Sequence, residues 1–229
     1  PDNRYAEQLR SEWLKYLAGQ GRWSELQRFY KSADPVELQC LFNQAQYLKG
    51  EKTAALSEAK KLWLSDTTLP PACDYLINAF KLSTEFSSQT VWKRFDLLLQ
   101  AKKASQAERL LSLLGEDEQR TAKFWLQLHI NSELINSPEF QNQPVDLKGM
   151  MFAHAVTRMA ATSPAFASLA WDGKKDQFEL PDTRRQQVEH DLALGLAKHK
   201  SFDAFPRLMK VSLVDEDIKD WRVRTALQE

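Results

Sequence analysis

Residues 47–50 read Tyr-Leu-Lys-Gly and precede alanines at 54, 55 and 59, and this stretch decides the fold of the chain. A helix that ends in small residues, followed at once by apolar residues at helical spacing, is typical of two helices folded back on each other. Residues 16–19, Tyr-Leu-Ala-Gly, precede Trp23, Leu26 and Phe29 in the same order. Weaker echoes occur at 99–102 and 196–199. We therefore expect a series of short helical hairpins.

Apolar residues recur at spacings of three and four along the whole chain, which predicts an all-α protein. One hairpin cannot cover its own apolar face, so the hairpins must stack on one another. The expected fold is an irregular right-handed α-superhelix, a solenoid of stacked short helical hairpins over residues 1–229. We expect helices at 3–18, 23–32, 35–49, 53–65, 71–82, 88–103, 105–114, 117–131, 148–161, 164–171, 182–199, 202–211 and 215–227.

Local signals refine this prediction. Asp34 precedes Pro35 as an expected helix N-cap, and Ser-Pro pairs at 137–138 and 163–164 repeat the arrangement. Within 88–103, Val91, Phe95, Leu98 and Leu99 share one face, whereas Lys93, Arg94 and Asp96 are expected to point away from it. Residues 136–146 are predicted to be a surface loop, and 172–182 a longer loop between helices. Residues 221–227 lie in a helical pattern without a polar capping helix, which leads us to expect a segment of a longer protein.

Composition excludes several classes of protein. There are 31 Lys and Arg residues against 31 Asp and Glu, so the chain lacks the excess positive charge of a nucleic-acid surface. The longest apolar run, 192–197, is far shorter than the roughly 20 residues of a transmembrane helix. We therefore expect neither a nucleic-acid partner nor a transmembrane segment. Seven glycines in the chain also disfavour hairpin-rich sheets and phosphate-binding loops.

The two cysteines, Cys40 and Cys73, lie in predicted helices that flank one complete helix at 53–65. In a stacked array these flanking helices are neighbours, so a disulfide is favoured over two buried free thiols. A disulfide of this kind indicates an oxidising compartment. No histidine lies near either cysteine in the sequence, and we expect no metal site and no cofactor.

The residues that could act in catalysis are expected to have structural roles instead. His129, His154, His190 and His199 each occur singly in helical stretches, and Glu189, His190 and Asp191 are adjacent positions that should not share a helix face. The acids at 116–118 and 215–217 lie at predicted helix N-termini, where their negative charge interacts favourably with the helix dipole. Most tryptophans have core spacing, such as Trp13 with Tyr16 and Leu17 or Trp125 with Leu128, although one or two could stack on a sugar. We expect no catalytic residue here.

One region resembles a known family. The run Cys-Leu-Phe-Asn-Gln-Ala at 40–45, Gly50, the run Ala-Lys-Lys-Leu-Trp-Leu at 59–64 and Pro-Ala-Cys-Asp at 71–74 resemble the amino-terminal, U-shaped superhelical region of bacterial soluble lytic transglycosylases. Residues 222–227 resemble a later helix of that region. The resemblance implies one superhelical domain, or part of one, over 1–229, and a disulfide between Cys40 and Cys73.

The resemblance also implies a function. The family acts in the periplasm on peptidoglycan glycan strands, cleaving between N-acetylmuramic acid and N-acetylglucosamine to leave a 1,6-anhydro ring. Its catalytic glutamate, in a Glu-Ser dipeptide, belongs to a separate carboxy-terminal lysozyme-like domain, and this chain contains no Glu-Ser dipeptide. We expect a non-catalytic segment that shapes substrate access beside that catalytic domain, within a parent enzyme. The alternative is a free-standing helical-repeat scaffold that binds a protein partner.

Overall fold

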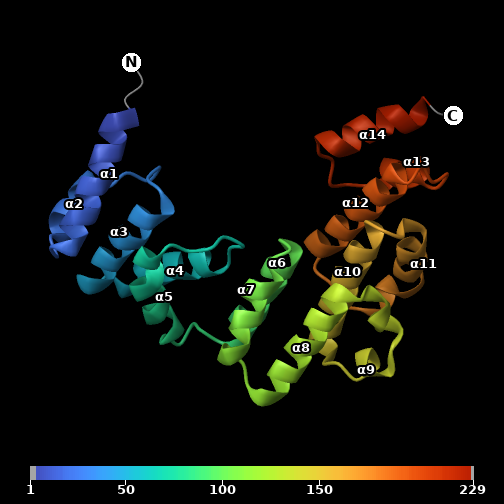
Figure 1. Ribbon diagram of the computed structural model, residues 1–229, viewed down its shortest axis with the longest axis horizontal. Helices are drawn as coiled ribbons and strands as arrows, with labels where there is room; N and C mark the ends of the chain where they lie inside the picture. The colour runs from blue at the N-terminus through green and yellow to red at the C-terminus, as the bar shows by residue number, and fades with distance from the viewer. Residues whose placement is uncertain (1–3, 228–229) are drawn as a thin grey trace. The chain divides into compact units, whose positions relative to one another are not determined.

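A computed structural model describes residues 4–227, and all regular secondary structure among them is helical. This confirms the all-α prediction. The chain divides into two compact units, residues 1–101 and 102–229. Figure 1 shows the helices of both units coloured by residue number. Residue 3, where the first predicted helix begins, lies outside the described residues.

The first unit contains six α-helices and a 3₁₀ turn at Pro71–Cys73 within its described residues. The helices are α1 (Arg4–Gly19), α2 (Trp23–Phe29), α3 (Val36–Leu48), α4 (Lys52–Trp63), α5 (Asp74–Lys81) and α6 (Ser88–Gln100). Each of α1 to α5 packs mainly on the helix before or after it in sequence, as the blue and cyan helices of Figure 1 show. Contacts between near neighbours in sequence are those of stacked hairpins. Leu14, Leu17, Leu26 and Leu38 join α1, α2 and α3 in one buried cluster.

The four similar junctions between helices share a left-handed backbone conformation at one residue. Gly50, directly after the C-cap of α3, has φ of 99°, and Gly21, after α1, has φ of 67°. Lys102 and Lys200 follow α6 and α12 with φ of 60° and 54°. A left-handed residue ends a helix by turning the chain back and satisfying its last carbonyl groups. The four similar junctions are therefore four helix terminations of one kind.

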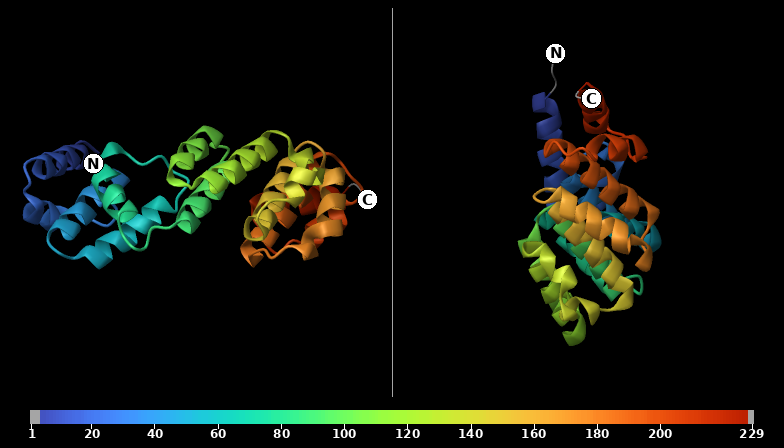
Figure 2. Two further views of the ribbon diagram at one scale, coloured as in Figure 1. Left: turned by 90° about the horizontal axis from the view of Figure 1, so that it is seen from below. Right: turned by 90° about the vertical axis from the view of Figure 1, so that its right-hand side faces the viewer.

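The second unit contains eight α-helices and 3₁₀ turns at Arg109–Leu113, Ser132–Asn136 and Lys175–Gln177 within its described residues. The helices are α7 (Ala104–Glu108), α8 (Glu116–Ile130), α9 (Pro138–Gln141), α10 (Val145–Ala160), α11 (Pro164–Lys174), α12 (Asp182–Lys198), α13 (Ala204–Lys210) and α14 (Glu216–Ala226). Helices α11 and α12 pack against α10, and α13 and α14 pack against α12 (Figure 2). Phe152 of α10 stacks on Trp171 of α11 with ring centroids 5.9 Å apart.

Close contact between α10 and α12 depends on Gly195. A Cβ atom at this position would lie 2.2 Å from the carbonyl oxygen of Ala160, the last residue of α10. No real Cβ atom tolerates that distance from backbone. The absence of a side chain at Gly195 therefore sets how closely the two helices approach.

Two predicted loops are partly wrong. Residues 136–146 contain α9, whose N-cap Ser137 accepts a hydrogen bond from the backbone N–H of Phe140, and Phe140 is buried. Because this segment contains several amides and prolines, the sequence did not indicate its short helix, which one buried aromatic side chain anchors. Helix α11 continues to Lys174 and a 3₁₀ turn follows it, so the loop predicted at 172–182 begins several residues later.

The face predicted for α6 is right for its apolar residues and wrong for two charged ones. Val91, Phe95, Leu98 and Leu99 are buried, as expected, but Arg94 and Asp96 are buried as well. Both charged groups have partners inside the protein, which the hydrophobic pattern could not reveal.

Of the described helices, none is long and apolar enough to cross a membrane.

Candidate functional site

The predicted disulfide is present and ties α3 to the 3₁₀ turn before α5. Cys40 and Cys73 are fully buried, with their Cα atoms 4.9 Å apart. Helix α4 lies between them in sequence and packs on both α3 and α5. Closing a loop of this length stabilises a fold by roughly 3–4 kcal/mol through the entropy of the unfolded chain. Its role in this unit is structural.

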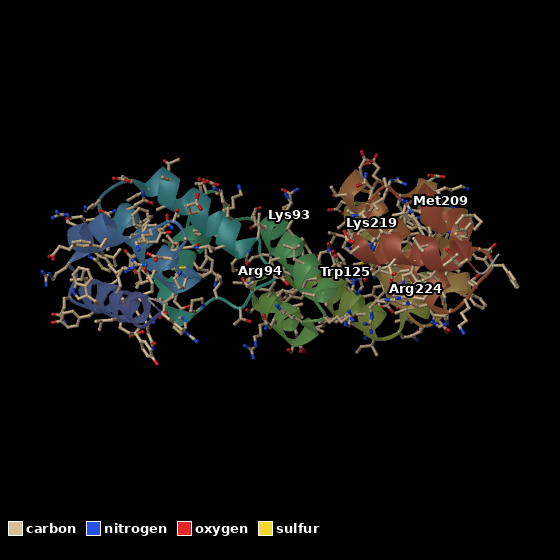
Figure 3. The ribbon with its side chains drawn as sticks, turned by 90° about the horizontal axis from the view of Figure 1, so that it is seen from above. Lys93, Arg94, Trp125, Met209, Lys219 and Arg224 are labelled. Atoms are coloured by element: carbon tan, nitrogen blue, oxygen red, sulfur yellow. A yellow bond between two sulfur atoms is a disulfide. The ribbon has the colours of Figure 1, made fainter. Side chains whose placement is uncertain are left out.

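Next to this disulfide-linked region, Arg94 of α6 holds the end of α4. Its guanidinium donates to the carbonyl oxygens of Trp63, Ser65 and Thr67, and Figure 3 shows Arg94 beside the exposed Lys93. In return the Trp63 indole N–H donates to the Thr90 carbonyl at 3.0 Å. Burial lowers the pKa of Arg94, but the carbonyl groups at a helix C-terminus offset the cost of burying its charge.

Arginines hold helix C-termini at three further places. Arg10 donates to the Phe29 carbonyl of α2, Arg158 to the His129 carbonyl of α8, and Arg222 to the Leu208 and Val211 carbonyls around the end of α13. Each guanidinium comes from a helix other than the one it caps. These arginines therefore connect helices of the stack and are committed to structure.

Asp34 does not cap α3 as predicted. Its buried carboxylate pairs with Arg10 and accepts from the backbone N–H of Lys31 at 2.8 Å, while Pro35 occupies the N-cap position. Burial alone would raise the pKa of Asp34, but the bonds from Arg10 and Lys31 outweigh it and lower the pKa. The carboxylate thus joins the turn before α3 to α1.

Two of the four histidines form a pair that the sequence did not indicate. His129 Nδ1 of α8 and His154 Nε2 of α10 lie 2.9 Å apart, both side chains are buried, and their rings stack. Burial lowers the pKa of His154 to about 3, helped by the positive charges of Arg184 and Arg158. Burial also lowers the pKa of His129. Both rings are therefore neutral near pH 7, and one donates to the other.

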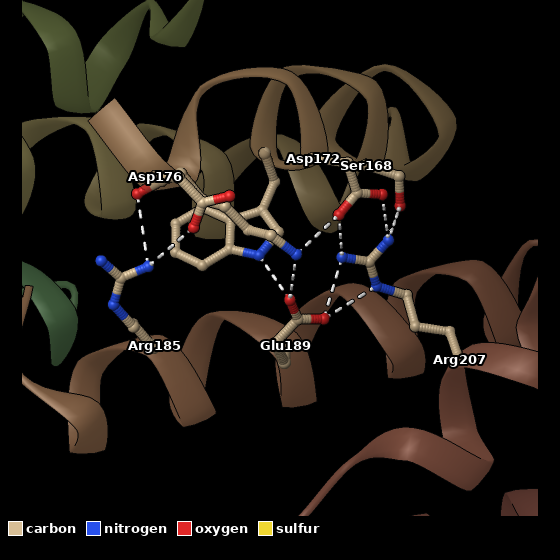
Figure 4. Close-up of polar contacts among 8 residues, drawn as sticks. Ser168, Asp172, Asp176, Arg185, Glu189 and Arg207 are labelled. Atoms are coloured by element: carbon tan, nitrogen blue, oxygen red, sulfur yellow. Dashed lines mark hydrogen bonds and ion pairs between the residues drawn. The ribbon is translucent and has the colours of Figure 1, made fainter. Parts of the chain in front are cut away.

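A cluster of charges joins α11, α12 and α13 (Figure 4). Arg207 contacts Asp172 Oδ2 and Glu189 Oε2, both at 2.9 Å, and Ser168 Oγ at 3.1 Å. The Trp171 indole N–H donates to Glu189 at 2.5 Å. Burial would raise the pKa of Asp172, but the bond from Arg207 outweighs it and lowers the pKa. A carboxylate held ionised by an arginine is suited to joining helices and unsuited to acting as a general acid.

His190 contacts its neighbour in sequence, a contact that the separation of adjacent positions around a helix did not indicate. Its Nδ1 lies 3.1 Å from Asp191 Oδ1, because the imidazole reaches along the helix surface, and its Nε2 lies 2.9 Å from Asp215 Oδ2. Asp215 is also the N-cap of α14, as predicted. The acids at 116–118 lie in the first turn of α8, also as predicted. Within 4–227, no group of three or more His, Cys, Asp or Glu side chains could hold a metal ion.

The tryptophans divide between core and surface. Trp125 and Leu128 are buried, as predicted, and Figure 3 labels Trp125 on α8. Trp13 is 38% exposed and meets Phe29 edge to face, so its assignment to the core is wrong. Tyr16 is exposed too, and only Leu17 of this trio is buried. Helical spacing alone did not show which side of α1 faces the stack.

A groove in the first unit has different chemistry from these structural clusters. It has a volume of about 490 Å³ and lies among the end of α2, α3 and α4. We name it the amide groove, after its lining residues Tyr30, Gln39, Phe42, Asn43, Gln46 and Ser57. Gln39, Asn43 and Gln46 follow one stripe of α3 because they are four and three residues apart. Tyr30 stacks on Phe42 with centroids 4.1 Å apart.

The polar atoms of the amide groove are incompletely used by the protein. Asn43 Nδ2 donates to the Gln39 carbonyl at 2.7 Å, and Gln39 Nε2 donates to the Asp34 carbonyl at 2.9 Å. These bonds fix the two side chains, while their side-chain oxygens, Gln39 Oε1 and Asn43 Oδ1, accept nothing from the described residues. Burial raises the pKa of Tyr30, which keeps its hydroxyl protonated. The groove therefore offers fixed donors and acceptors beside an aromatic surface.

Sequence reasoning missed the amide groove. The spacing of the three amides on the helix of Cys40 was a usable signal, since all three fall on one face. The stacking of Tyr30 on Phe42 and the contribution of α4 depend on how hairpins pack, which spacing along the chain does not encode.

Comparison with known proteins finds a curated relative along almost the whole chain. It is 27% identical over 220 residues, or 95% of its length, to the soluble lytic murein transglycosylase of Escherichia coli strain K12. The chain is homologous to the soluble lytic murein transglycosylases. It spans 32% of the length of that relative. No family model matches the sequence.

Solved structures of soluble lytic transglycosylases have the same fold as this homologue. An inactive mutant of the lytic transglycosylase Slt from Pseudomonas aeruginosa matches 97% of this chain and 36% of its own, with 24% identity and a TM-score of 0.85. The 70 kDa soluble lytic transglycosylase of Escherichia coli matches 98% of this chain and 34% of its own, with 22% identity and a TM-score of 0.62. The superhelical fold class is thereby confirmed.

Proposed function

We propose that this chain is a non-catalytic superhelical segment of a periplasmic lytic transglycosylase. The parent enzyme cleaves peptidoglycan between N-acetylmuramic acid and N-acetylglucosamine with formation of a 1,6-anhydro product. Residues 1–229 form one superhelical domain or part of one, and a lysozyme-like domain elsewhere in the parent polypeptide performs the chemistry. The observation that carries this proposal is the 27% identity to a soluble lytic murein transglycosylase along 95% of the chain.

The role proposed for the segment is to shape which glycan strands reach the catalytic domain. The polar clusters support a structural function, because Arg10, Arg94, Arg158, Arg207 and Arg222 are all engaged in joining helices. Stacked helices that are cross-linked by buried and half-buried side chains within each unit suit a segment that guides a long polymer. The buried disulfide supports the periplasm as its location, since disulfides persist in oxidising compartments.

Two measurements on insoluble murein sacculi test the proposal. The chain alone should leave the turbidity of a sacculus suspension unchanged, because the proposed chemistry belongs to a separate lysozyme-like domain. It should nevertheless be retained by the sacculi when they are pelleted. Clearing by the chain alone would show that the segment is catalytic. Absence of retention, together with capture of a protein partner, would favour the free-standing scaffold.

A further inference from the structure

The amide groove has the chemistry of a saccharide site. Its row of amides runs from Gln39 to Gln46, roughly 10 Å along α3 at the helical rise per residue, which is long enough for two linked pyranose rings. Each primary amide presents a donor and an acceptor, as sugar hydroxyl and N-acetyl groups require. The volume of about 490 Å³ falls within the range of small-ligand pockets.

The aromatic pair provides the apolar part of such a site. Tyr30 and Phe42 stack 4.1 Å apart and both line the groove, so their outer surfaces are presented beside the amides. A pyranose ring has a face of C–H groups that packs on aromatic rings, while its hydroxyl edge needs hydrogen bonds. Aromatic residues with a polar tip, such as Tyr30, serve both needs.

Charge distinguishes among the parts of peptidoglycan. No lysine or arginine lines the groove, and its charged member, Glu58, is a carboxylate already paired with Lys61 at 2.6 Å. N-acetylmuramic acid carries a carboxylate on its lactyl group when it bears no peptide, and on the peptide stem when it does, and this lining offers no positive partner for either. N-acetylglucosamine is uncharged and carries the N-acetyl group that the amides match.

We infer that the amide groove binds the uncharged N-acetylglucosamine units of a glycan strand. This inference rests on the proposed function and goes beyond it, because it assigns the contact to specific residues of α3 and the adjoining ring pair. Asn43 is the central residue: it is buried, its amide is held by the Gln39 carbonyl, and its own oxygen remains available. Ser57 of α4 faces the same groove from the other side.

The test is titration of the ¹⁵N-labelled chain with triacetylchitotriose, an uncharged oligomer of N-acetylglucosamine. Saturable shifts should be confined to residues 30–58 and should not appear with a free peptide stem. Gln46→Ala and Tyr30→Phe should each weaken binding about three- to tenfold, since each removes one net hydrogen bond. Gln186→Ala, an exposed glutamine of α12, is the matched control and should bind like the parent chain.

Circular dichroism of each variant separates loss of binding from loss of folding, and Tyr30→Phe retains the stacked ring. Absence of saturable shifts, shifts centred on other residues, or equal weakening by Gln186→Ala would each overturn the inference. If sacculi retain the chain but chitotriose does not bind, the inference about the amide groove is wrong and the proposed function stands. Loss of both would remove the proposed function as well.

Discussion

The guanidinium of Arg94 lies 4.9 Å from the centre of the Trp63 ring and also donates to the Trp63 backbone carbonyl. One side chain of α6 thus contacts both the last carbonyl group of α4 and the aromatic ring of the last residue of that helix. The Trp63 indole N–H returns a bond to Thr90 of α6. Two helices far apart in sequence are joined in both directions.

Replacing this arginine should destabilise the first unit. Arg94→Ala removes charged hydrogen bonds to four carbonyl groups, those of Leu62, Trp63, Ser65 and Thr67, so we expect a loss of about 3 kcal/mol in the free energy of unfolding. Arg94→Lys should retain only part of the stability, because one ammonium cannot reach all four carbonyl oxygens. Urea denaturation measures both. Lys93→Ala, at the exposed neighbouring position, should change stability by less than about 0.5 kcal/mol; a similar effect of both alanine variants would contradict this account.

Reduction of the disulfide should lower stability by roughly 3–4 kcal/mol, because the loop between Cys40 and Cys73 gains entropy in the unfolded chain. The measurement is denaturant unfolding with and without a reductant. The double variant Cys40→Ala, Cys73→Ala should be insensitive to reductant. A thiol assay on denatured, unreduced protein should detect no free thiol, and finding two would disprove the bond.

The histidine pair predicts that stability falls in mild acid. The folded-state pKa of His154 lies near 3, below the unfolded value, so the unfolded chain binds more protons between these values. The contribution is complete above about pH 6.5 and is lost as the pH falls toward 3, at up to about 1.4 kcal/mol per pH unit. His129, whose pKa is also lowered, adds in the same direction.

Unfolding of the second unit measured between pH 7 and 4.5 tests this, because lowered aspartate pKa values act below that interval. His154→Gln should flatten the dependence on pH, whereas His199→Gln, at an exposed position, is the matched control and should leave it steep. An unchanged slope in His154→Gln would show that the pair does not couple to folding.

Gly195→Ala should severely destabilise the second unit, since its Cβ would lie 2.2 Å from the Ala160 carbonyl oxygen. Forcing α10 and α12 apart should cost about 3 kcal/mol or more. Gly173→Ala is the matched control, because nothing lies within 4 Å of a Cβ there. In helix α11 that change should stabilise by up to about 1 kcal/mol. Thermal unfolding of both variants provides the measurement, and equal midpoints would contradict the close-approach argument.

The amino-acid sequence by itself determined the helical class, most helix positions, the four similar junctions and the pairing of Cys40 with Cys73. These features are local or follow from stacking of consecutive hairpins, because the period of apolar residues states which face must be buried. The motifs around Cys40 and Trp63 also indicated the family, and homology bears this out.

Only the tertiary structure decided which polar side chains meet. His129 and His154, Arg94 and Trp63, and the two sides of the amide groove come from different helices, and their meeting depends on the rotation and offset of one helix against another. A long side chain such as arginine reaches several residues from its own position, so its partner is not written in its spacing. For the same reason, the spacing of apolar residues wrongly predicted that Arg94 and Asp96 point toward solvent. That spacing indicates which positions need hydrophobic burial, but it does not show where a buried charge finds compensating partners.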